Sequence, residues 1–386
     1  MSDRFALHVS LFYGAFFFYT GLSLPFMPVW LAAKGLDPRE IGIVLAAPLV
    51  ARVVAVPLSA RLADRLGMLQ RALVAAALAS VAAFALVGLL SGFAAIFAAY
   101  ALAATVLAPV LPLGDAYALR GLRGRMPRYG PVRLWGSVTF IVANLGGGLL
   151  LARLGAGDVI WAVTAALALT AAAALALPRT TPEVAAPADA RGAQASLWRS
   201  PPFVAVVLGA GLIQASHAVL YGFATLQWSA RGIGGTAIGA LWALGVVAEV
   251  LLFALSGRIV GALGPIRMIV LGGAGGAVRW GVMALDPPTA ALPLLQCLHA
   301  LSFAATHLGA MHFMAQAVPA GRGATAQGDF VAVQGIVFAG AMSLSGVLVS
   351  AYGSAAYGAM AGVAVLGTVL AGAAFAWRRG APGGRL

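Results

Sequence analysis

Long apolar segments of about 20 residues follow one another along nearly the whole chain. A helix of about this length crosses the hydrocarbon core of a bilayer. The segments are continuously apolar, whereas the strands of a membrane barrel are shorter and alternate. The pattern predicts an all-α membrane protein with twelve transmembrane helices, near residues 5–31, 39–61, 70–90, 93–118, 131–153, 158–177, 203–229, 236–262, 265–284, 290–316, 325–350 and 353–377.

One stretch, 178–202, breaks this pattern because it is rich in proline, charged and small residues. Such a composition is typical of an exposed linker. We therefore expect an N-terminal six-helix bundle over 1–177, a cytoplasmic linker over 178–202, and a C-terminal six-helix bundle with a short tail over 203–386.

The two halves repeat each other at an offset of 197 residues. K-G-L-D-P-R-E-I-G ends at Gly42 and R-G-I-G-G-T-A-I-G ends at Gly239, while A-R-L-A-D-R-L-G ends at Gly67 and G-R-I-V-G-A-L-G ends at Gly264. Two matches at one offset indicate a duplication and two pseudo-symmetric bundles. Parallel repeats of this kind are typical of transporters, whose substrate sites lie near the bilayer midplane between the repeats.

The composition supports a membrane protein, since 62% of the 386 residues are hydrophobic and only 9% are charged. The net charge of +13 comes from basic residues between the apolar segments, which favours membrane topology over nucleic-acid binding. Of 24 Lys and Arg residues, 17 lie on the side of the N-terminus; three lie within spans and four on the other side, the latter being Lys34, Arg39, Arg153 and Arg231. We expect both termini in the cytoplasm, in a bacterial inner membrane, and a monomer surrounded by lipid.

The charged residues that stand out within predicted spans are Arg52, Asp115, Arg133, Glu249 and Arg279, while Asp329 lies near the start of the eleventh. A charge near the bilayer centre costs several kcal/mol, so it needs a partner or a water-lined cavity. Arg52 and Glu249 differ by 197, which makes them equivalent positions of the two halves. They either face a common cavity, which we favour, or form a structural ion pair between the halves.

Asp115 and Arg133 lie at the facing ends of consecutive predicted helices. They can form a pair that contributes to substrate binding. The alternative is that Arg133 extends its side chain towards the membrane interface.

Glu249 is the best candidate to carry a proton, because a poorly solvated carboxyl group favours its protonated form. His307 is a second candidate, since imidazole titrates near neutral pH. His299 lies eight residues before it, and one broad helix face can hold both; each can also be a packing residue. A polar stripe of Gln214, His217 and Tyr221, at i, i+3 and i+7, is expected to face a cavity.

No enzyme constellation is visible in the sequence. The single cysteine, Cys297, has no metal-ligand partner at a useful spacing, so no metal site is expected. The glycine-rich run 272–281 lies within a predicted span and favours close helix packing over nucleotide binding. We expect no cofactor, and a proton gradient as the energy source.

The loop after the second span reads L-A-D-R-L-G, from Leu62 to Gly67. It resembles the signature loop between helices two and three of the major facilitator superfamily, with Asp64, Arg65 and Gly67 matching. The resemblance implies that these residues latch the cytoplasmic face.

Longer segments resemble a narrower group. Y-G-P-V-R-L-W-G-S (129–137), Q-A-S-H-A-V-L-Y-G-F (214–223) and L-W-A-L-G-V-V-A-E-V (241–250) are similar to the phenylpropionate:proton symporter group, which is related to the lactose permease. This resemblance covers nearly the whole chain. It implies the twelve-helix major facilitator fold and proton-coupled uptake.

The lactose permease resemblance implies roles for single charges. Asp115 and Arg133 match a substrate-binding acid–arginine pair of helices four and five. Glu249, Arg279 and His307 match the carboxylate of helix eight, the arginine of helix nine and the histidine of helix ten.

That resemblance also contains a departure. The related permeases carry the proton on a glutamate one helical turn after the histidine, where this chain has Ala310 or Met311. The proton-carrying role therefore shifts towards Glu249.

Together these patterns predict a proton-coupled symporter of a small molecule. Glu249, Arg279 and His307 are expected to couple proton to substrate, while Arg52, Asp115, Arg133, Gln214, His217, Tyr221 and His299 are expected to bind substrate. The excess of membrane arginines over carboxylates favours an aromatic carboxylate. A sugar or nucleoside symporter is the main alternative. A drug/proton antiporter is less favoured because Gly130-Pro131 lies before the fifth span, and a membrane sensor because the chain has no long tail.

Overall fold

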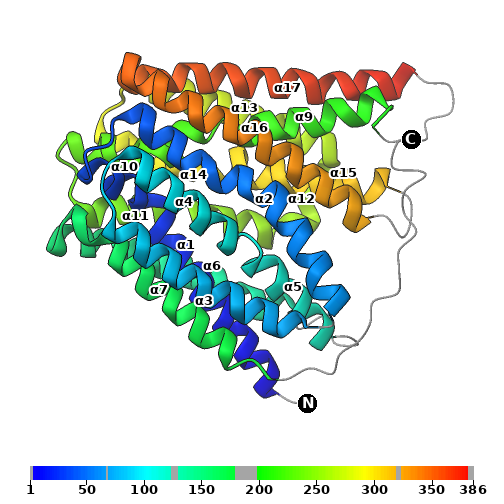
Figure 1. Ribbon diagram of the computed structural model, residues 1–386. Helices are drawn as coiled ribbons and strands as arrows, with labels where there is room; N and C mark the ends of the chain where they lie inside the picture. The colour runs from blue at the N-terminus through cyan, green and yellow to red at the C-terminus, as the bar shows by residue number, and fades with distance from the viewer. Residues whose placement is uncertain (1–2, 67, 123–128, 179–197, 319–322, 381–386) are drawn as a thin grey trace. The chain divides into compact units, whose positions relative to one another are not determined.

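A computed structural model describes residues 3–66, 68–122, 129–178, 198–318 and 323–380. All regular elements in these ranges are helical (Figure 1). The α-helices are α1 (Asp3–Ala33), α2 (Pro38–Leu66), α3 (Leu69–Leu89), α4 (Phe93–Leu107), α5 (Val110–Gly121), α6 (Tyr129–Leu154), α7 (Val159–Leu175), α9 (Pro201–Ala215), α10 (Ala218–Ala230), α11 (Gly235–Ala254), α12 (Ser256–Leu263), α13 (Pro265–Ala284), α14 (Leu292–Cys297), α15 (Thr306–Ala317), α16 (Gly323–Tyr352) and α17 (Ala356–Gly380).

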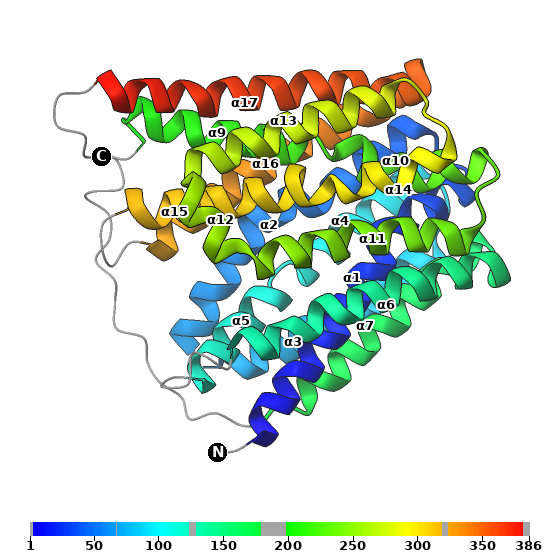
Figure 2. The ribbon, with the colours of Figure 1, turned by 180° about the vertical axis from the view of Figure 1, so that it is seen from behind.

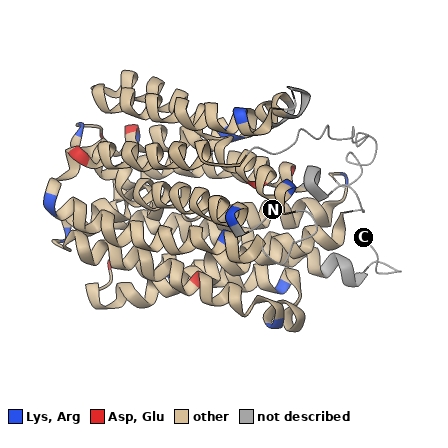
Figure 3. Ribbon diagram, turned by 90° about the horizontal axis from the view of Figure 1, so that it is seen from below, with Lys and Arg blue, Asp and Glu red and all other residues tan. Residues whose placement is uncertain are grey.

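The helices account for the predicted spans. Ten stretches of the described residues are long and apolar enough to cross a membrane, and an eleventh is the bent pair α12–α13. One of the ten, Gln327–Phe375, contains two helices, α16 and α17, separated by a 3-10 turn. The hydropathy pattern therefore predicted the membrane helices correctly, and Figure 3 shows how little of the ribbon is charged.

The chain divides into two compact units. The first contains residues 1–186 and 221–243, and the second contains 187–220 and 244–386. The division at 178–202 that the sequence suggests stays a prediction. The loop with Asp64, Arg65 and Gly67 is described only in part. The side chains of Asp64 and Arg65 and the whole of Gly67 lie outside the described residues.

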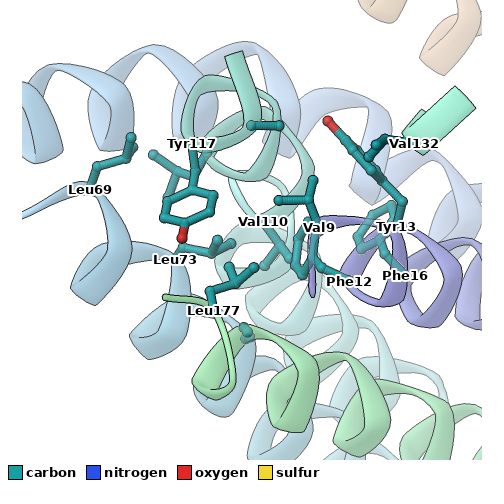
Figure 4. Packing of buried hydrophobic residues seen from close by; sticks show 14 of the residues in the cluster. Val9, Phe12, Tyr13, Phe16, Leu69, Leu73, Val110, Tyr117, Val132 and Leu177 are labelled. Atoms are coloured by element: carbon teal, nitrogen blue, oxygen red, sulfur yellow. The ribbon is translucent and has the colours of Figure 1, made fainter. Parts of the chain in front are cut away.

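The core of the first unit is built on one face of α1. Phe5, Val9, Phe12, Tyr13 and Phe16 recur at helical spacing and are all buried. They pack with buried residues of α3, α5 and α6 and of the end of α7, as Figure 4 shows. This packing holds α1 against α6 and α7 and fixes the position of Tyr13.

In the second unit, α17 lies along α9 and α13, and α16 lies along α9 (Figures 1 and 2). Small residues allow α9 and α17 to approach at backbone distance. A Cβ atom on Gly367 would lie 2.6 Å from the carbonyl oxygen of Gly209, and one on Gly209 would lie 2.6 Å from that of Gly367. Such contacts stabilise helix pairs in membranes, where no hydrophobic effect drives association.

Several spans are interrupted. Pro109, which has no N–H to continue a helix, separates α4 from α5. Ser216 and His217 separate α9 from α10, and a π-helical turn, Ala300–Ala305, connects the α14 segment to α15. α12 and α13 meet at 105° on Gly264, whose φ is 74°. Broken helices in a bilayer are tolerated where other protein groups satisfy the freed backbone.

The close approach of α9 and α17 gives a test. Gly367→Val is expected to lower the free energy of unfolding by about 1–3 kcal/mol, because the added carbons overlap the backbone of α9. Gly362→Val on the same helix is the matched control, since its Cβ would meet nothing within 4 Å. Thermal unfolding in detergent measures both. Equal midpoints for the two variants would contradict the packing.

Candidate functional site

Each unit carries a cluster of polar side chains within its membrane helices. In the first unit the centre is Asp115 on α5. The Tyr13 hydroxyl donates to Asp115 Oδ1 at 2.6 Å, and the Tyr129 hydroxyl donates to the same oxygen at 3.4 Å. A partly buried carboxylate is thereby held by two phenols from α1 and α6.

Arg133 lies on the aromatic side of this cluster. Its guanidinium carbon is 3.9 Å from the ring centroid of Phe17 and 5.3 Å from that of Tyr13. Phe17 and Tyr13 are four residues apart, so one face of α1 presents both rings. A guanidinium over aromatic rings keeps its N–H edge available for a planar acceptor such as a carboxylate.

The structure brings Asp115 and Arg133 to one cluster, as the sequence predicted, but a third residue lies between them. Among the described contacts no ion pair within 4.0 Å joins them. Tyr13 connects the two, since its hydroxyl contacts Asp115 and its ring contacts Arg133. Arg133 is half-buried, and whether its side chain reaches the membrane interface stays a prediction.

In the second unit the centre is Arg279 on α13, whose side chain is 0% exposed. Its Nη2 donates to Gln296 Oε1 at 2.7 Å. Its Nη1 donates to Ser302 Oγ at 3.2 Å and lies 3.2 Å from His299 Nδ1. A carboxamide, a hydroxyl and an imidazole thus surround a buried cation, which needs such acceptors at this depth.

His299 connects Arg279 to Glu249. Its other ring nitrogen, Nε2, lies 3.4 Å from Glu249 Oε2, and the side chains of His299 and Glu249 are 10% and 18% exposed. The row Arg279–His299–Glu249 therefore leads from a fully buried cation to a partly accessible carboxylate. Groups arranged in this way can exchange a proton at the carboxylate end while the buried end stays in place.

His217, at the break between α9 and α10, joins the same cluster. Its Nε2 lies 3.1 Å from Ser302 Oγ, and its Nδ1 lies 3.0 Å from the carbonyl oxygen of Gln214. The Gln214 side chain donates to the carbonyl oxygen of Phe303 at 3.2 Å. The predicted stripe of span seven therefore divides: Gln214 and His217 belong to this cluster, while Tyr221 packs against Trp242 in the first unit.

The π-helical turn sets the direction of the histidines. In an α-helix, residues eight apart differ by about 80°, but a π turn absorbs about one residue and reduces this to about 20°. His299 stacks on Phe303 at 5.0 Å, and Phe303 stacks on His307 at 6.1 Å. His307 thus continues a row of rings and packs against Phe253.

Trp280 and Tyr357 form the back of the cluster. The indole N–H of Trp280 donates to Ser216 Oγ at 2.8 Å, and its ring stacks on Tyr357 with centroids 5.8 Å apart. Trp280 also lies under the Arg279 guanidinium at 4.5 Å. This aromatic wall fixes the guanidinium in one orientation.

The remaining predicted site residue, Arg52 on α2, belongs to the first unit and has an exposed side chain. Its relation to Glu249 stays a prediction. The sequence reasoning missed Gln296 and Ser302, although each lies three residues from His299 in an otherwise apolar run. Among the described residues, no group of three or more His, Cys, Asp or Glu side chains could hold a metal ion.

Comparison with known proteins agrees with the sequence resemblance. The MFS_1 like family matches residues 6–361. The chain is 33% identical over 319 residues to a probable 3-phenylpropionic acid transporter of Escherichia coli (strain K12), covering 80% of this chain and 81% of that protein. It is 31% identical over 288 residues to a maltose permease of Geobacillus stearothermophilus, covering 72% of this chain and 71% of that protein.

Solved structures share the fold. The nucleoside transporter NupG aligns with a TM-score of 0.85 at 17% identity, over 96% of this chain and 99% of that one. A bacterial homologue of the human lysosomal transporter Spinster aligns with a TM-score of 0.78 at 15% identity, over 100% and 99%. The major facilitator fold predicted from the sequence is therefore confirmed. The chain belongs to the MFS_1 like family and is a multi-pass membrane transporter of the major facilitator superfamily, not an enzyme.

Proposed function

We propose that this transporter is a symporter that imports a small aromatic carboxylate together with a proton. The observation that carries the proposal is the row Arg279–His299–Glu249, a set of ionisable groups kept inside an apolar helix bundle. Because burying charged groups in a membrane costs free energy, such a cluster is typical of a transport site. The proton gradient supplies the energy, and no cofactor takes part.

The proton is proposed to bind at Glu249. Its carboxylate is the accessible end of the row, and it has an imidazole N–H partner in His299. Proton binding neutralises one charge of the row and changes its hydrogen bonds. Such a change of charge at a buried site can bias an equilibrium between two conformations of the transporter.

The substrate class follows from the first cluster. Arg133 offers a cation beside the rings of Phe17 and Tyr13, which suits a molecule with a carboxylate and an aromatic ring. The 33% identical relative is named as a 3-phenylpropionic acid transporter, which supports this class.

A sugar is the second candidate, because another relative is named as a maltose permease. Sugar hydroxyls need polar acceptors, and Asp115 is the acidic acceptor of this cluster. Its Oδ1 already accepts from Tyr13 and Tyr129, which leaves less of its capacity for a ligand. This favours the carboxylate.

The membrane and orientation are part of the proposal. The excess of Lys and Arg on the side of the N-terminus supports both termini in the cytoplasm of a bacterial cell, with the chain in the inner membrane. We propose that it functions as a monomer in the lipid bilayer.

Proton coupling can be tested at Glu249. In vesicles with an imposed pH gradient, the wild type is expected to accumulate 3-phenylpropionate, whereas Glu249→Gln retains exchange of preloaded substrate and loses accumulation. The amide keeps the shape of the side chain but cannot titrate. Asp158→Asn, at an exposed carboxylate before α7, is the control and should behave as wild type. Accumulation by Glu249→Gln, or uptake by the wild type that ignores the gradient, would contradict coupling at Glu249.

The anionic substrate can be tested at Arg133. Labelled 3-phenylpropionate uptake should be inhibited by unlabelled acid and much less by its neutral amide. Arg133→Gln is expected to weaken apparent affinity by about 10- to 100-fold, the range for losing a charge-assisted hydrogen bond. Arg153→Gln, exposed near the other end of α6, should leave it unchanged. Stronger inhibition by maltose or a nucleoside than by the acid would support the alternative substrates.

A further inference from the structure

The contacts of Arg279 determine which nitrogen of His299 carries a hydrogen. A guanidinium has only donors and does not lose its proton in proteins. Its Nη1 lies 3.2 Å from His299 Nδ1, so Nδ1 must be the acceptor and carry no hydrogen. A neutral imidazole then has its hydrogen on Nε2, the nitrogen that lies 3.4 Å from Glu249 Oε2. His299 is therefore a donor to Glu249.

His217 is held in the opposite tautomer. Its Nδ1 lies 3.0 Å from a backbone carbonyl oxygen of Gln214, which can only accept. Nδ1 therefore carries the hydrogen, and Nε2 accepts from the hydroxyl of Ser302 at 3.1 Å. The Ser302 oxygen in turn accepts from Arg279 Nη1. The two hydrogens of Nη1 thus serve two histidines, His299 directly and His217 through Ser302.

A second proton on His299 has no acceptor in this arrangement. It would have to bind Nδ1, where its N–H would point at an N–H of Arg279 and place two positive charges about 3 Å apart. The groups that face His299 are Glu249 on α11, Arg279 on α13 and His217 between α9 and α10, with His307 beyond Phe303. Of these, Glu249 alone offers an acceptor oxygen whose protonation leaves the bond to Arg279 intact.

We propose that Arg279 is a positioning residue that locks His299 in its Nε2–H tautomer, so that the transported proton binds Glu249 while His299 stays neutral. That the transported proton binds Glu249 rests on the proposed function, whereas the tautomer of His299 does not. Ser302 and Gln296 hold Arg279 in place for this role.

The tautomers can be measured directly. Nitrogen-15 NMR of histidine-labelled protein in liposomes distinguishes bare, hydrogen-carrying and imidazolium nitrogens, and loss of a signal in His299→Gln assigns it. We expect His299 with a bare Nδ1 and a hydrogen on Nε2 at neutral pH, and a mixture of tautomers in Arg279→Gln. A hydrogen on Nδ1 of wild-type His299 would overturn the proposal, even if Arg279→Gln does not fold.

Two substitutions of His299 test its role in transport. The Nε2 of glutamine lies as many bonds from Cγ as the Nε2 of histidine, so His299→Gln keeps a non-titrating N–H for Glu249. Asparagine places its oxygen like Nδ1 and cannot reach Glu249. We expect His299→Gln to accumulate substrate within about threefold of wild type and His299→Asn to lose accumulation. His312→Gln is the control, because the His312 ring bonds the Leu308 carbonyl of its own helix and lies outside the cluster.

The outcomes separate the two proposals. If His299 itself carries the proton, His299→Gln will lose accumulation as Glu249→Gln does, and the assignment to Glu249 is overturned. If wild-type uptake ignores the pH gradient, the proposed symport fails, and the NMR result still decides whether Arg279 sets the tautomer.

Discussion

The structure depends on one constraint, which is that a cation in a helix bundle within a bilayer must find its acceptors inside the protein. Arg279 is 0% exposed and contacts an amide oxygen, a hydroxyl and an imidazole nitrogen. Because a guanidinium cannot be neutralised, its hydrogens dictate which lone pairs its neighbours present. The tautomer proposed for His299 therefore follows from the position of one side chain.

Breaks in the helices make this position possible. Ser216 and His217 lie where α9 stops and α10 begins, so Ser216 Oγ can accept from Trp280 and the Gln214 carbonyl can accept from His217. The π-helical turn holds Ser302 beneath Arg279 and keeps the rings at 299, 303 and 307 in one row. Irregular backbone is costly in a membrane, and here side chains of neighbouring helices satisfy it.

Hydropathy predicted the spans because the length of an apolar segment is set by the bilayer. The same reasoning found Asp115, Arg133, Glu249 and Arg279, since charges stand out in apolar sequence. It could not find Gln296 and Ser302, because their importance comes from contacts between helices. It assigned proton coupling to His307 and substrate binding to His299, since a regular helical rotation hides the π turn that makes His299 the neighbour of Arg279. The sequence suggested a direct Asp115–Arg133 pair. In the structure Tyr13, from a distant part of the chain, connects the two residues.

The two halves of the duplication have diverged in charge. Equivalent positions hold Arg52 in the first unit and Glu249 in the second. In the first unit Arg133 lies beside aromatic rings, which suits the carboxylate and ring of the proposed substrate, while in the second unit Glu249 lies beside His299, which suits the proposed proton site. Each cluster also holds a group of the opposite charge, Asp115 in the first and Arg279 in the second, so an anion or a proton that binds alone changes the net charge of its cluster. Under the proposed symport, an anion lowers the charge of one cluster and a proton raises the charge of the other, so only the binding of both leaves the summed charge of the transporter unchanged.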